Sequence, residues 1–219
     1  GFNTSDNPFG TAASRTSIVN QIMTYVDRLN LDGVDIDIEV TDSNTWSNFD
    51  AFCSELSGRL KAEGKLFTMA VSSWFTDPIA NSTYNYFDFV NLMTYDAAFG
   101  DGEVAPWSQI NNMVTYYGNR GISKDRMTIG VPFYGYASGA KDYTYAQILA
   151  MDSNNKNLDY YNGIYYNGEK TIREKAEFSK DYGGIMIWEL GQDSFGSNSL
   201  LAAIKDVMQT ETVVPVSQI

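Results

Sequence analysis

The amino-acid sequence of 219 residues predicts an α/β fold of the (β/α)8-barrel class. Strand-like and helix-like segments alternate along the chain, and the strand-like segments are apolar, which indicates a parallel sheet covered by helices. Polar side chains follow four of the five predicted strands, and no glycine-rich phosphate loop opens the first helix. A barrel is therefore favoured over an open doubly wound sheet. Only five of the eight strands of such a barrel are found in the sequence.

The first three elements are predicted from the spacing of apolar residues. Residues 14–30 carry apolar side chains every three or four positions, and the sequence LDG that follows breaks this pattern. Residues 33–40 alternate apolar and acidic side chains, as a strand does. In residues 43–65, aromatic and leucine side chains step by three or four, so we expect one helix that Gly64 ends.

The alternation continues through the middle of the chain. Residues 66–72 form the next predicted strand, and residues 87–96 hold another. A glycine-containing loop then leads into a predicted helix over residues 107–118. Residues 127–136 are predicted to be a strand that runs into a Pro/Gly turn, because the apolar run MTIGV is followed by Pro132.

The last part of the chain contains a longer interval, 137–182, before the final strand. Two helices are expected in it, around 143–151 and 170–182, and the sequence YYNGIYYNG between them is typical of a hairpin or turn. The remaining predictions are a strand over 183–190, a helix over 197–209 and a tail over 210–219.

Charge and composition exclude several classes of function. The chain has 27 acidic and 15 basic residues and a net charge of −12, so nucleic acid and anionic membrane surfaces are not expected partners. It contains no histidine, which excludes Ser-His-Asp hydrolysis, His-assisted cysteine catalysis and His-containing zinc sites. Cys53 is the single cysteine and is expected to be a small buried apolar residue. No apolar run is long enough to cross a bilayer, and the first ten residues are not a signal peptide.

Three acids lie on one side of the strand predicted in the sequence LDGVDIDIEV. Asp35, Asp37 and Glu39 alternate with the apolar residues Val34, Ile36 and Ile38. Neighbouring carboxylates are therefore about 7 Å apart. Three dehydrated charges at that spacing would repel one another strongly. The acids therefore either face water or take part in chemistry. A calcium site is disfavoured because the segment lacks the turn glycine of a calcium-binding loop.

Four ordered motifs give the sequence a resemblance to a known family. The segment DGVDIDIE, Asp32 to Glu39, matches the Asp-x-x-Asp-x-Asp-x-Glu signature of family 18 glycoside hydrolases, the chitinase-like family, in its bacterial type. NLMTYD, GVPFYGY and GGIMIWEL resemble that family's sixth, seventh and eighth strand segments, in the same order. The resemblance spans nearly the whole chain. It implies a (β/α)8 catalytic domain, of which this chain carries strands 4 to 8.

The resemblance also implies how the chain is organised. Residues 1–209 would be the C-terminal part of a catalytic barrel, with a small insertion at about 137–182 between strands 7 and 8. The first three strands would lie outside this sequence, and Gly1 would follow directly on the third. We expect the chain to be part of a larger protein, or a truncated polypeptide, whose missing N-terminal segment is required to cover its strand edges.

The resemblance implies the family's substrate-assisted retaining mechanism, which assigns a role to each acid. In it, the substrate's own 2-acetamido oxygen attacks the anomeric carbon and forms an oxazolinium ion. Glu39 would be the general acid and later the base, with a pKa raised by burial and by the Asp37 charge. Asp37 would hold the acetamido N–H, and Asp35 would share a proton with Asp37. No cofactor and no metal are implied.

The same resemblance assigns aromatic and polar residues to the sugar. Tyr95 would donate its phenol to the acetamido oxygen. Trp188 would form the floor under the C–H face of the ring. The further substrate-binding residues would be Met93, Asp96, Tyr134 and Tyr136. These residues and the acids are expected to converge on a pocket for one acetylated sugar. Trp46 is expected in the core, and Trp74 and Trp107 at the border of the groove.

The expected function is hydrolysis of β-1,4 bonds beside N-acetylglucosamine, in an oligosaccharide or polysaccharide, most simply as a chitinase. One alternative is an endo-β-N-acetylglucosaminidase acting on N-glycans, with the same first sugar subsite. Another is a chitinase-like lectin that binds without cutting, which the presence of both Asp37 and Glu39 disfavours. Members of the family are usually exported, so a secreted, periplasmic or cell-surface location is expected.

Overall fold

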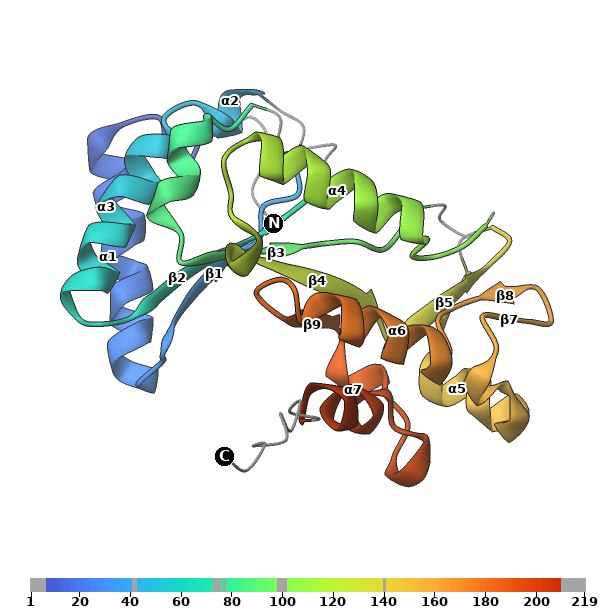
Figure 1. Cartoon of the computed structure of the whole chain (residues 1–219). Helices are drawn as coiled ribbons and strands as arrows, with labels where there is room; N and C mark the ends of the chain where they lie inside the picture. The colour runs from blue at the N-terminus through green and yellow to red at the C-terminus, as the bar shows by residue number, and fades with distance from the viewer. Residues whose placement is uncertain are drawn as a thin grey trace, which may run out of the picture. The chain divides into compact units, whose positions relative to one another are not determined.

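The computed structural model describes residues 7–40, 43–72, 76, 78–97, 102–139 and 141–209, and the chain divides into two compact units (Figure 1). The first unit comprises Gly1–Met93 and Asn111–Thr128, and the second comprises Thr94–Ile110 and Ile129–Ile219. Each unit has its own buried core. Within the described residues, no helix has both the length and the apolar character needed to cross a bilayer.

The five predicted strands are all present in one sheet, which confirms the predicted alternation of parallel strands and helices. The strand order is β1-β2-β3-β4-β9, and the pairs β1–β2, β2–β3 and β4–β9 are parallel. β4 has its first two residues in the first unit and its last four in the second. The strands are β1 (Gly33–Ile36), β2 (Leu66–Val71), β3 (Phe89–Leu92), β4 (Met127–Pro132) and β9 (Ile185–Trp188).

Helices of the first unit form where the apolar spacing predicts them. Thr11 caps α1 (Ala12–Leu29), because its hydroxyl accepts the Ser14 N–H at 3.1 Å and the Ser14 hydroxyl accepts the Thr11 N–H at 3.2 Å. The helix ends at Asn30, in the left-handed conformation with φ of 49°. α1 lies beside α3 (Phe49–Ala62) (Figure 1). The buried rings of Phe9, which precedes α1, and Phe52 of α3 stack at 4.6 Å.

The prediction of one continuous helix over residues 43–65 is wrong. The segment forms a short α2 (Ser43–Trp46) and then α3, with Asn48 at a φ of 64° between them. Asparagine tolerates this left-handed conformation, so the chain can turn there although the apolar spacing continues. Trp46 is buried, as predicted, and its indole N–H donates to the carbonyl of Val40 at 3.1 Å. Gly64, with φ of 66°, follows the end of α3 as predicted.

The strand predicted at residues 127–136, running into a Pro/Gly turn, is present as β4, but the residues after Pro132 form a further strand that was not predicted. β4 ends at Pro132, opposite Trp188, because its parallel partner β9 ends there. Tyr134–Ala137 then forms β5, which belongs to a second, antiparallel sheet of order β6-β5-β8-β7. The strand β6 (Lys141–Thr144) was not predicted, and β7 (Tyr160–Tyr161) and β8 (Ile164–Tyr165) form the predicted hairpin. Its two-residue turn is Asn162-Gly163, with φ of 48° and 85°.

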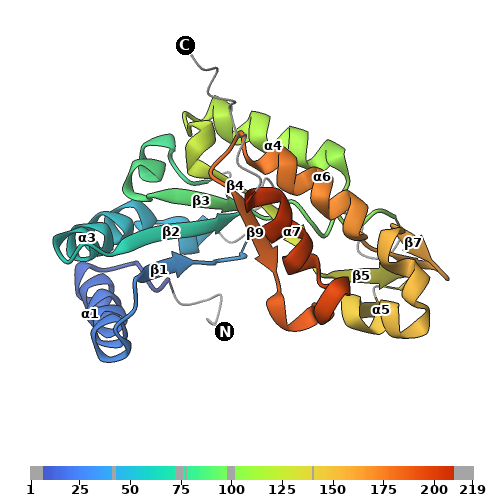
Figure 2. The same ribbon diagram turned by 60° about the horizontal axis from the view of Figure 1, so that its bottom comes forward.

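The second unit is completed by three helices around a core shared with both sheets. α5 (Tyr145–Met151), α6 (Glu169–Ser179) and α7 (Leu200–Gln209) lie where helices were predicted. α6 and α7 pack against each other and against Ile185 and Ile187 of β9 (Figure 2). The remaining helical elements are α4 (Trp107–Asn119), which begins in the second unit and ends in the first, and the short 3-10 helices η1 (Asn81–Tyr86), η2 (Lys124–Arg126), η3 (Ser153–Asn157), η4 (Leu190–Gln192) and η5 (Gly196–Asn198).

A buried lysine anchors α6. The Lys175 ammonium has no exposed surface and donates to the Ala105 carbonyl and to the side-chain oxygen of Asn167, each at 2.5 Å. Its burial lowers its pKa to about 8, because a charged amine is poorly solvated there. The lysine thereby ties the segment before α4 to the segment before α6.

Candidate functional site

The three acids predicted to carry the chemistry lie in the first unit, at and beyond the end of β1. The strand is shorter than predicted, since it ends at Ile36, so Asp37 and Glu39 lie in the extended segment that follows. The predicted alternation is confirmed: Ile36 is buried, whereas the acidic side chains are exposed. The burial expected for Glu39 is not found, because this residue lies three positions past the last paired residue of an edge strand.

Asp35 is held in place by two neutral partners on neighbouring strands. The Thr68 hydroxyl, on β2, donates to Asp35 Oδ1 at 2.5 Å, and the Asn91 amide, on β3, donates to the same oxygen at 2.8 Å. Asn91 in turn accepts from the Thr128 hydroxyl at 2.7 Å. The sequence motif did not reveal these partners. Strand pairing is the feature that could have revealed Thr68, because this residue is paired with Asp35 in the parallel register.

The pKa values of Asp35 and Asp37 are both raised. For Asp35, loss of hydration is the largest cause and outweighs the hydrogen bonds from Thr68 and Asn91, which act in the opposite direction. Much of the residue's surface is exposed, but Oδ1 faces those two side chains rather than open water. For Asp37, loss of hydration is again the largest cause, and the Asp35 charge adds to it. The two carboxylates therefore retain a proton more readily than isolated aspartates do.

The raised pKa values of Asp35 and Asp37 should affect how the stability of the protein depends on pH. A raised pKa in the folded state contributes stability that is fully present below the unfolded-state value of 3.8 and is lost as pH rises through the folded-state pKa. The unfolding free energy of the wild type should therefore decrease between about pH 4 and pH 7. Changing Asp35 to Asn should make this decrease smaller, by less than about 1 kcal/mol because solvent screens the site. Urea midpoints at both pH values measure this, with Asp27→Asn on the exposed side of α1 as the control. An Asp35→Asn profile that follows the wild type would contradict the raised pKa of Asp35.

The second group of predicted residues lies in the second unit. We call Tyr95, Asp96, Tyr134 and Tyr136 the aromatic cluster. The Tyr134 hydroxyl donates to Asp96 Oδ1 at 2.6 Å, and the Tyr134 ring lies edge-on to Tyr95 at 6.3 Å and to Tyr136 at 5.4 Å. Loss of hydration raises the pKa of Asp96, although hydrogen bonds from Tyr134 and Tyr136 act against it. Asp96 itself has a φ of 60°, a conformation that aspartate tolerates better than most residues.

Trp188 lies on the same face of β9 as a residue that contacts the aromatic cluster. Ile185 and Ile187 pack into the core of the second unit, so Met186 and Trp188 point to the opposite face of the strand. The Tyr95 hydroxyl donates to the Met186 sulfur at 3.8 Å. The Trp188 side chain is 52% exposed, which leaves its ring accessible to a ligand. Met186 was missed by sequence reasoning, although its i, i+2 relation to Trp188 is the signal that could have found it.

The remaining predicted residues have simpler positions. Met93, at the end of the first unit's continuous segment, is buried, and its N–H donates to the Val71 carbonyl at 2.9 Å. Cys53 is buried in α3, as predicted, and burial raises the pKa of its thiol. Trp74 lies outside the described residues. Within the described residues, no group of three or more acidic or cysteine side chains is arranged to hold a metal ion.

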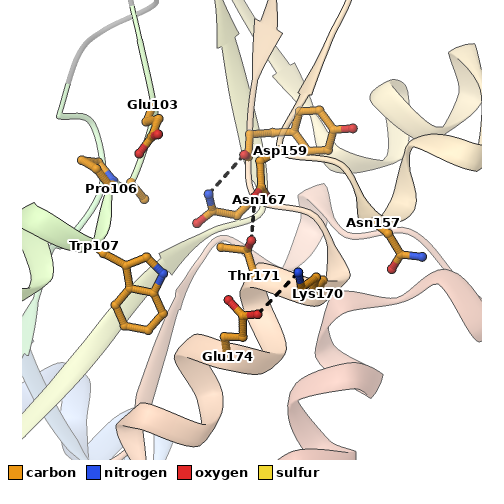
Figure 3. Close-up of a pocket in the computed structure, with 11 residues that line it drawn as sticks. Glu103, Pro106, Trp107, Asn157, Asp159, Asn167, Lys170, Thr171 and Glu174 are labelled. Atoms are coloured by element: carbon orange, nitrogen blue, oxygen red, sulfur yellow. Dashed lines mark hydrogen bonds and ion pairs between the residues drawn. The ribbon is translucent and has the colours of Figure 1, made fainter.

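Trp107 lines a pocket that none of the predicted site residues reaches (Figure 3). This pocket of the second unit has a volume of about 330 Å³. Two of its acids are paired within the protein: Asp159 accepts from the Gly168 N–H at 2.8 Å and from the Thr171 hydroxyl at 2.6 Å, and Glu174 lies 4.0 Å from the Lys170 ammonium. Asp159 thus holds the start of α6, which gives this acid a structural role.

Comparison with known proteins agrees with these motifs. The family model described as glycosyl hydrolases family 18 matches residues 3–193. The solved structure of the chitinase ChiB of Flavobacterium johnsoniae is 32% identical, with a TM-score of 0.83 over 91% of this chain and 67% of that chain. A chitinase of Bacteroides thetaiotaomicron is 28% identical, with the same TM-score of 0.83 over 93% of this chain and 72% of its own. Both similarities show a chitinase-like fold, consistent with an incomplete (β/α) barrel.

A curated relative matches a shorter region. A sporulation-specific glycosylase of Bacillus subtilis is 31% identical over 133 residues, which are 56% of this chain and 31% of that protein. The chain therefore spans about a third of the length of this relative.

Proposed function

The chain belongs to family 18 of the glycosyl hydrolases, and from this membership we propose that it cleaves β-1,4 linkages next to N-acetylglucosamine, most simply as a chitinase. The observation that carries the proposal is the arrangement of the signature acids. Asp35 is fixed by Thr68 and Asn91, and Asp37 follows it on the same side with a pKa raised partly by the Asp35 charge. These observations support the proposal that Asp35 and Asp37 act as the coupled pair of substrate-assisted hydrolysis, beside a general acid.

In the proposed reaction the acids of the first unit act in sequence. Glu39 gives its proton to the glycosidic oxygen while the substrate's acetamido oxygen bonds to the anomeric carbon and the glycosidic C–O bond breaks. Asp37 accepts a hydrogen bond from the acetamido N–H and stabilises the positive charge of the oxazolinium ion. Asp35 meanwhile takes up the proton that the pair shares. Water then attacks the same carbon, Glu39 accepts its proton, and the acetamido group is restored.

The aromatic cluster and Trp188 are proposed to bind the sugar. Tyr95 would donate its phenol to the acetamido oxygen, which is a better acceptor than the Met186 sulfur that this hydroxyl contacts. The exposed Trp188 ring would lie under the C–H face of the sugar. The hydrogen-bonded residues Asp96 and Tyr134 would contact its hydroxyl groups, together with Tyr136. Met93 is proposed as an apolar neighbour of the same sugar.

The finer details of organisation belong to this proposal as well. We assign β1, β2, β3, β4 and β9 to strands 4 to 8 of the barrel, and residues 137–182 to an insertion between strands 7 and 8. Residues 210–219 remain a proposed tail. An additional N-terminal segment would supply the first three strands and be needed for full activity. Export from the cell, as is usual for the family, is proposed as the location.

Product analysis tests the function. The chain, and a longer protein that contains it, are incubated with chitin oligosaccharides and separately with N-glycans, and the products are read by mass. Shortened chitin oligosaccharides whose new ends are first β-anomers support the proposal, because retaining hydrolysis conserves the anomeric configuration. Cleavage restricted to N-glycans would identify the endo-β-N-acetylglucosaminidase instead. Binding of chitin oligosaccharides without any product from the longer protein would identify a lectin.

A further inference from the structure

We propose that Thr128 and Asn91 are positioning residues of the reaction, which act with Thr68 to keep the exchangeable proton of Asp35 on a single oxygen, Oδ2. The inference rests on the proposed function, because that function gives Asp35 a proton to take up and release. It deepens the function by assigning roles to three side chains outside the acidic signature. All of these residues belong to the first unit.

The register of the parallel strands brings these side chains to one face of the sheet. Asp35 of β1 is paired with Thr68 of β2, and Ala70, two positions further along β2, is paired with Asn91 of β3. Side chains two positions apart along a strand point to the same face. The Thr128 hydroxyl of β4 reaches Asn91 at 2.7 Å. Four consecutive strands of the sheet therefore each contribute one side chain to a continuous series of hydrogen bonds.

The hydroxyl groups of this series are shielded from water by an apolar setting. Thr68 and Thr128 are both buried, with 7% of each residue exposed. The residues that flank Thr68, Asn91 and Thr128 along their strands are also buried: Phe67, Met69, Val90, Leu92, Met127 and Ile129. A buried hydroxyl needs a partner within the protein, so each threonine is bound to direct its proton at the acceptor beside it.

The direction of each hydrogen bond follows from the chemistry of the groups. The Thr128 hydroxyl donates to the Asn91 side-chain oxygen, and the Asn91 amide N–H donates to Asp35 Oδ1 at 2.8 Å. An ionised carboxylate has no proton to give, so the group that faces it must be a donor. A reversed amide would turn the Asn91 oxygen toward the carboxylate and remove the acceptor of the Thr128 proton. Thr128 therefore favours the one amide orientation that stabilises the charge on Asp35.

The two donors that reach Asp35 meet at the same oxygen. Oδ1 accepts from the Thr68 hydroxyl at 2.5 Å and from the Asn91 amide at 2.8 Å, whereas no hydrogen bond from the described residues reaches Oδ2. An oxygen that accepts two hydrogen bonds has both lone pairs engaged, so a proton on Oδ1 would displace one of the donors. Protonation of Asp35 therefore takes place at Oδ2.

This restriction matters for the proposed reaction. When Asp37 binds the acetamido N–H, its own O–H bond breaks, the electron pair stays on Asp37, and a lone pair of Asp35 takes the proton. A proton on Oδ1 would lie between the Thr68 hydroxyl and the Asn91 amide, and it would have to change oxygens before it returns to Asp37. A proton on Oδ2 needs no such step. The network thus holds the proton where it can be exchanged in each turnover.

Removing one hydroxyl of the network tests the inference. With a hexameric chitin oligosaccharide, Thr128→Val is expected to lower kcat by about 2- to 10-fold with little change in KM, because the lost hydrogen bond does not involve the substrate. The part of the kcat pH profile assigned to the proposed Asp35–Asp37 pair should move to higher pH, because the Asn91 hydrogen bond favours the ionised form of Asp35. Thr128→Ser keeps the hydroxyl and should restore both quantities.

Thr83→Val is the matched control. Thr83 is buried in the same unit, and its hydroxyl donates to Asp50 Oδ1 at 2.8 Å, so this variant loses an equivalent hydrogen bond elsewhere. It should keep the wild-type kcat and pH profile. If the wild type is active and the pH profile of Thr128→Val matches that of Thr83→Val, the network is refuted and the proposed function stands. A lower kcat without a shifted profile has the same meaning, since a merely structural role predicts it.

An inactive wild type would instead refute the proposed function, and the titration of Asp35 then decides on the network. The ¹³C chemical shift of its carboxyl carbon, followed by NMR as the pH is raised, measures its pKa without any substrate. A higher pKa of Asp35 in Thr128→Val than in Thr83→Val and Thr128→Ser would support the network. Equal pKa values in the three variants would overturn it.

Discussion

Replacing Glu39 by Gln is expected to lower kcat on chitin oligosaccharides by about 10²- to 10⁴-fold while oligosaccharide affinity stays within a few-fold. The amide preserves the shape of the side chain but has no acidic proton to give to the leaving oxygen. The loss should therefore appear in the chemical step and not in ground-state binding. Initial rates measure the first quantity, and calorimetric titration of the same variant measures the second.

A matched control for this variant is Glu63→Gln, an exposed glutamate at the end of α3. It should retain wild-type turnover. If Glu39→Gln also retained wild-type turnover, Glu39 would not be the general acid, and the mechanism derived from the signature would have to be abandoned. A loss of binding equal to the loss of rate would instead show that Glu39 acts in holding the substrate.

Replacing Asp37 by Asn should lower kcat by about 10²- to 10³-fold, the usual loss when one charge-stabilising group is removed from a site. The asparagine carbonyl can still accept the acetamido N–H, so KM should change little. In the proposed mechanism the variant loses the negative charge opposite the oxazolinium ion, together with the partner proposed to share a proton with Asp35. The pH profile of kcat should consequently lose the part that reports the coupled pair.

The kinetic signature of Asp37→Asn distinguishes charge stabilisation from simple binding. A variant with unchanged kcat and a strongly raised KM would show that Asp37 only holds the substrate. Asp27→Asn on α1 serves as the control for removing an exposed aspartate. Wild-type behaviour of that control is needed to attribute the loss to the position of Asp37.

The sequence predicted the regular part of the fold because its signals are local. The periodicity of apolar residues located the five strands of the parallel sheet and the longer helices, and the sequence Asn162-Gly163 located the hairpin turn. The break at Asn48 was missed because apolar spacing continues through it, and a left-handed residue leaves no trace in periodicity. The strand β6 was missed because four residues become a strand only through pairing with β5.

In the candidate site, too, only the features that depend on local sequence could be predicted. The alternation of acids along residues 33–40 was correct, because it follows from strand geometry alone. The partners of Asp35 and the burial of Lys175 depend on contacts between segments far apart in the chain, and a single sequence carries no information on these. The Trp107 pocket is of the same kind, since three separate segments line it. Roles of individual residues came from the family resemblance and not from the pattern itself.

The attachment of Asp35 has an electrostatic consequence for the catalytic acids. Its hydrogen-bond partners, a threonine hydroxyl and an asparagine amide, carry no formal charge. A lysine or arginine in their place would cancel the excess negative charge permanently. In the proposed mechanism a proton would supply that neutralisation instead, and unlike a fixed side-chain charge it can leave during turnover. In the proposed mechanism, the resting site would therefore carry an uncompensated negative charge that the positively charged oxazolinium ion can neutralise.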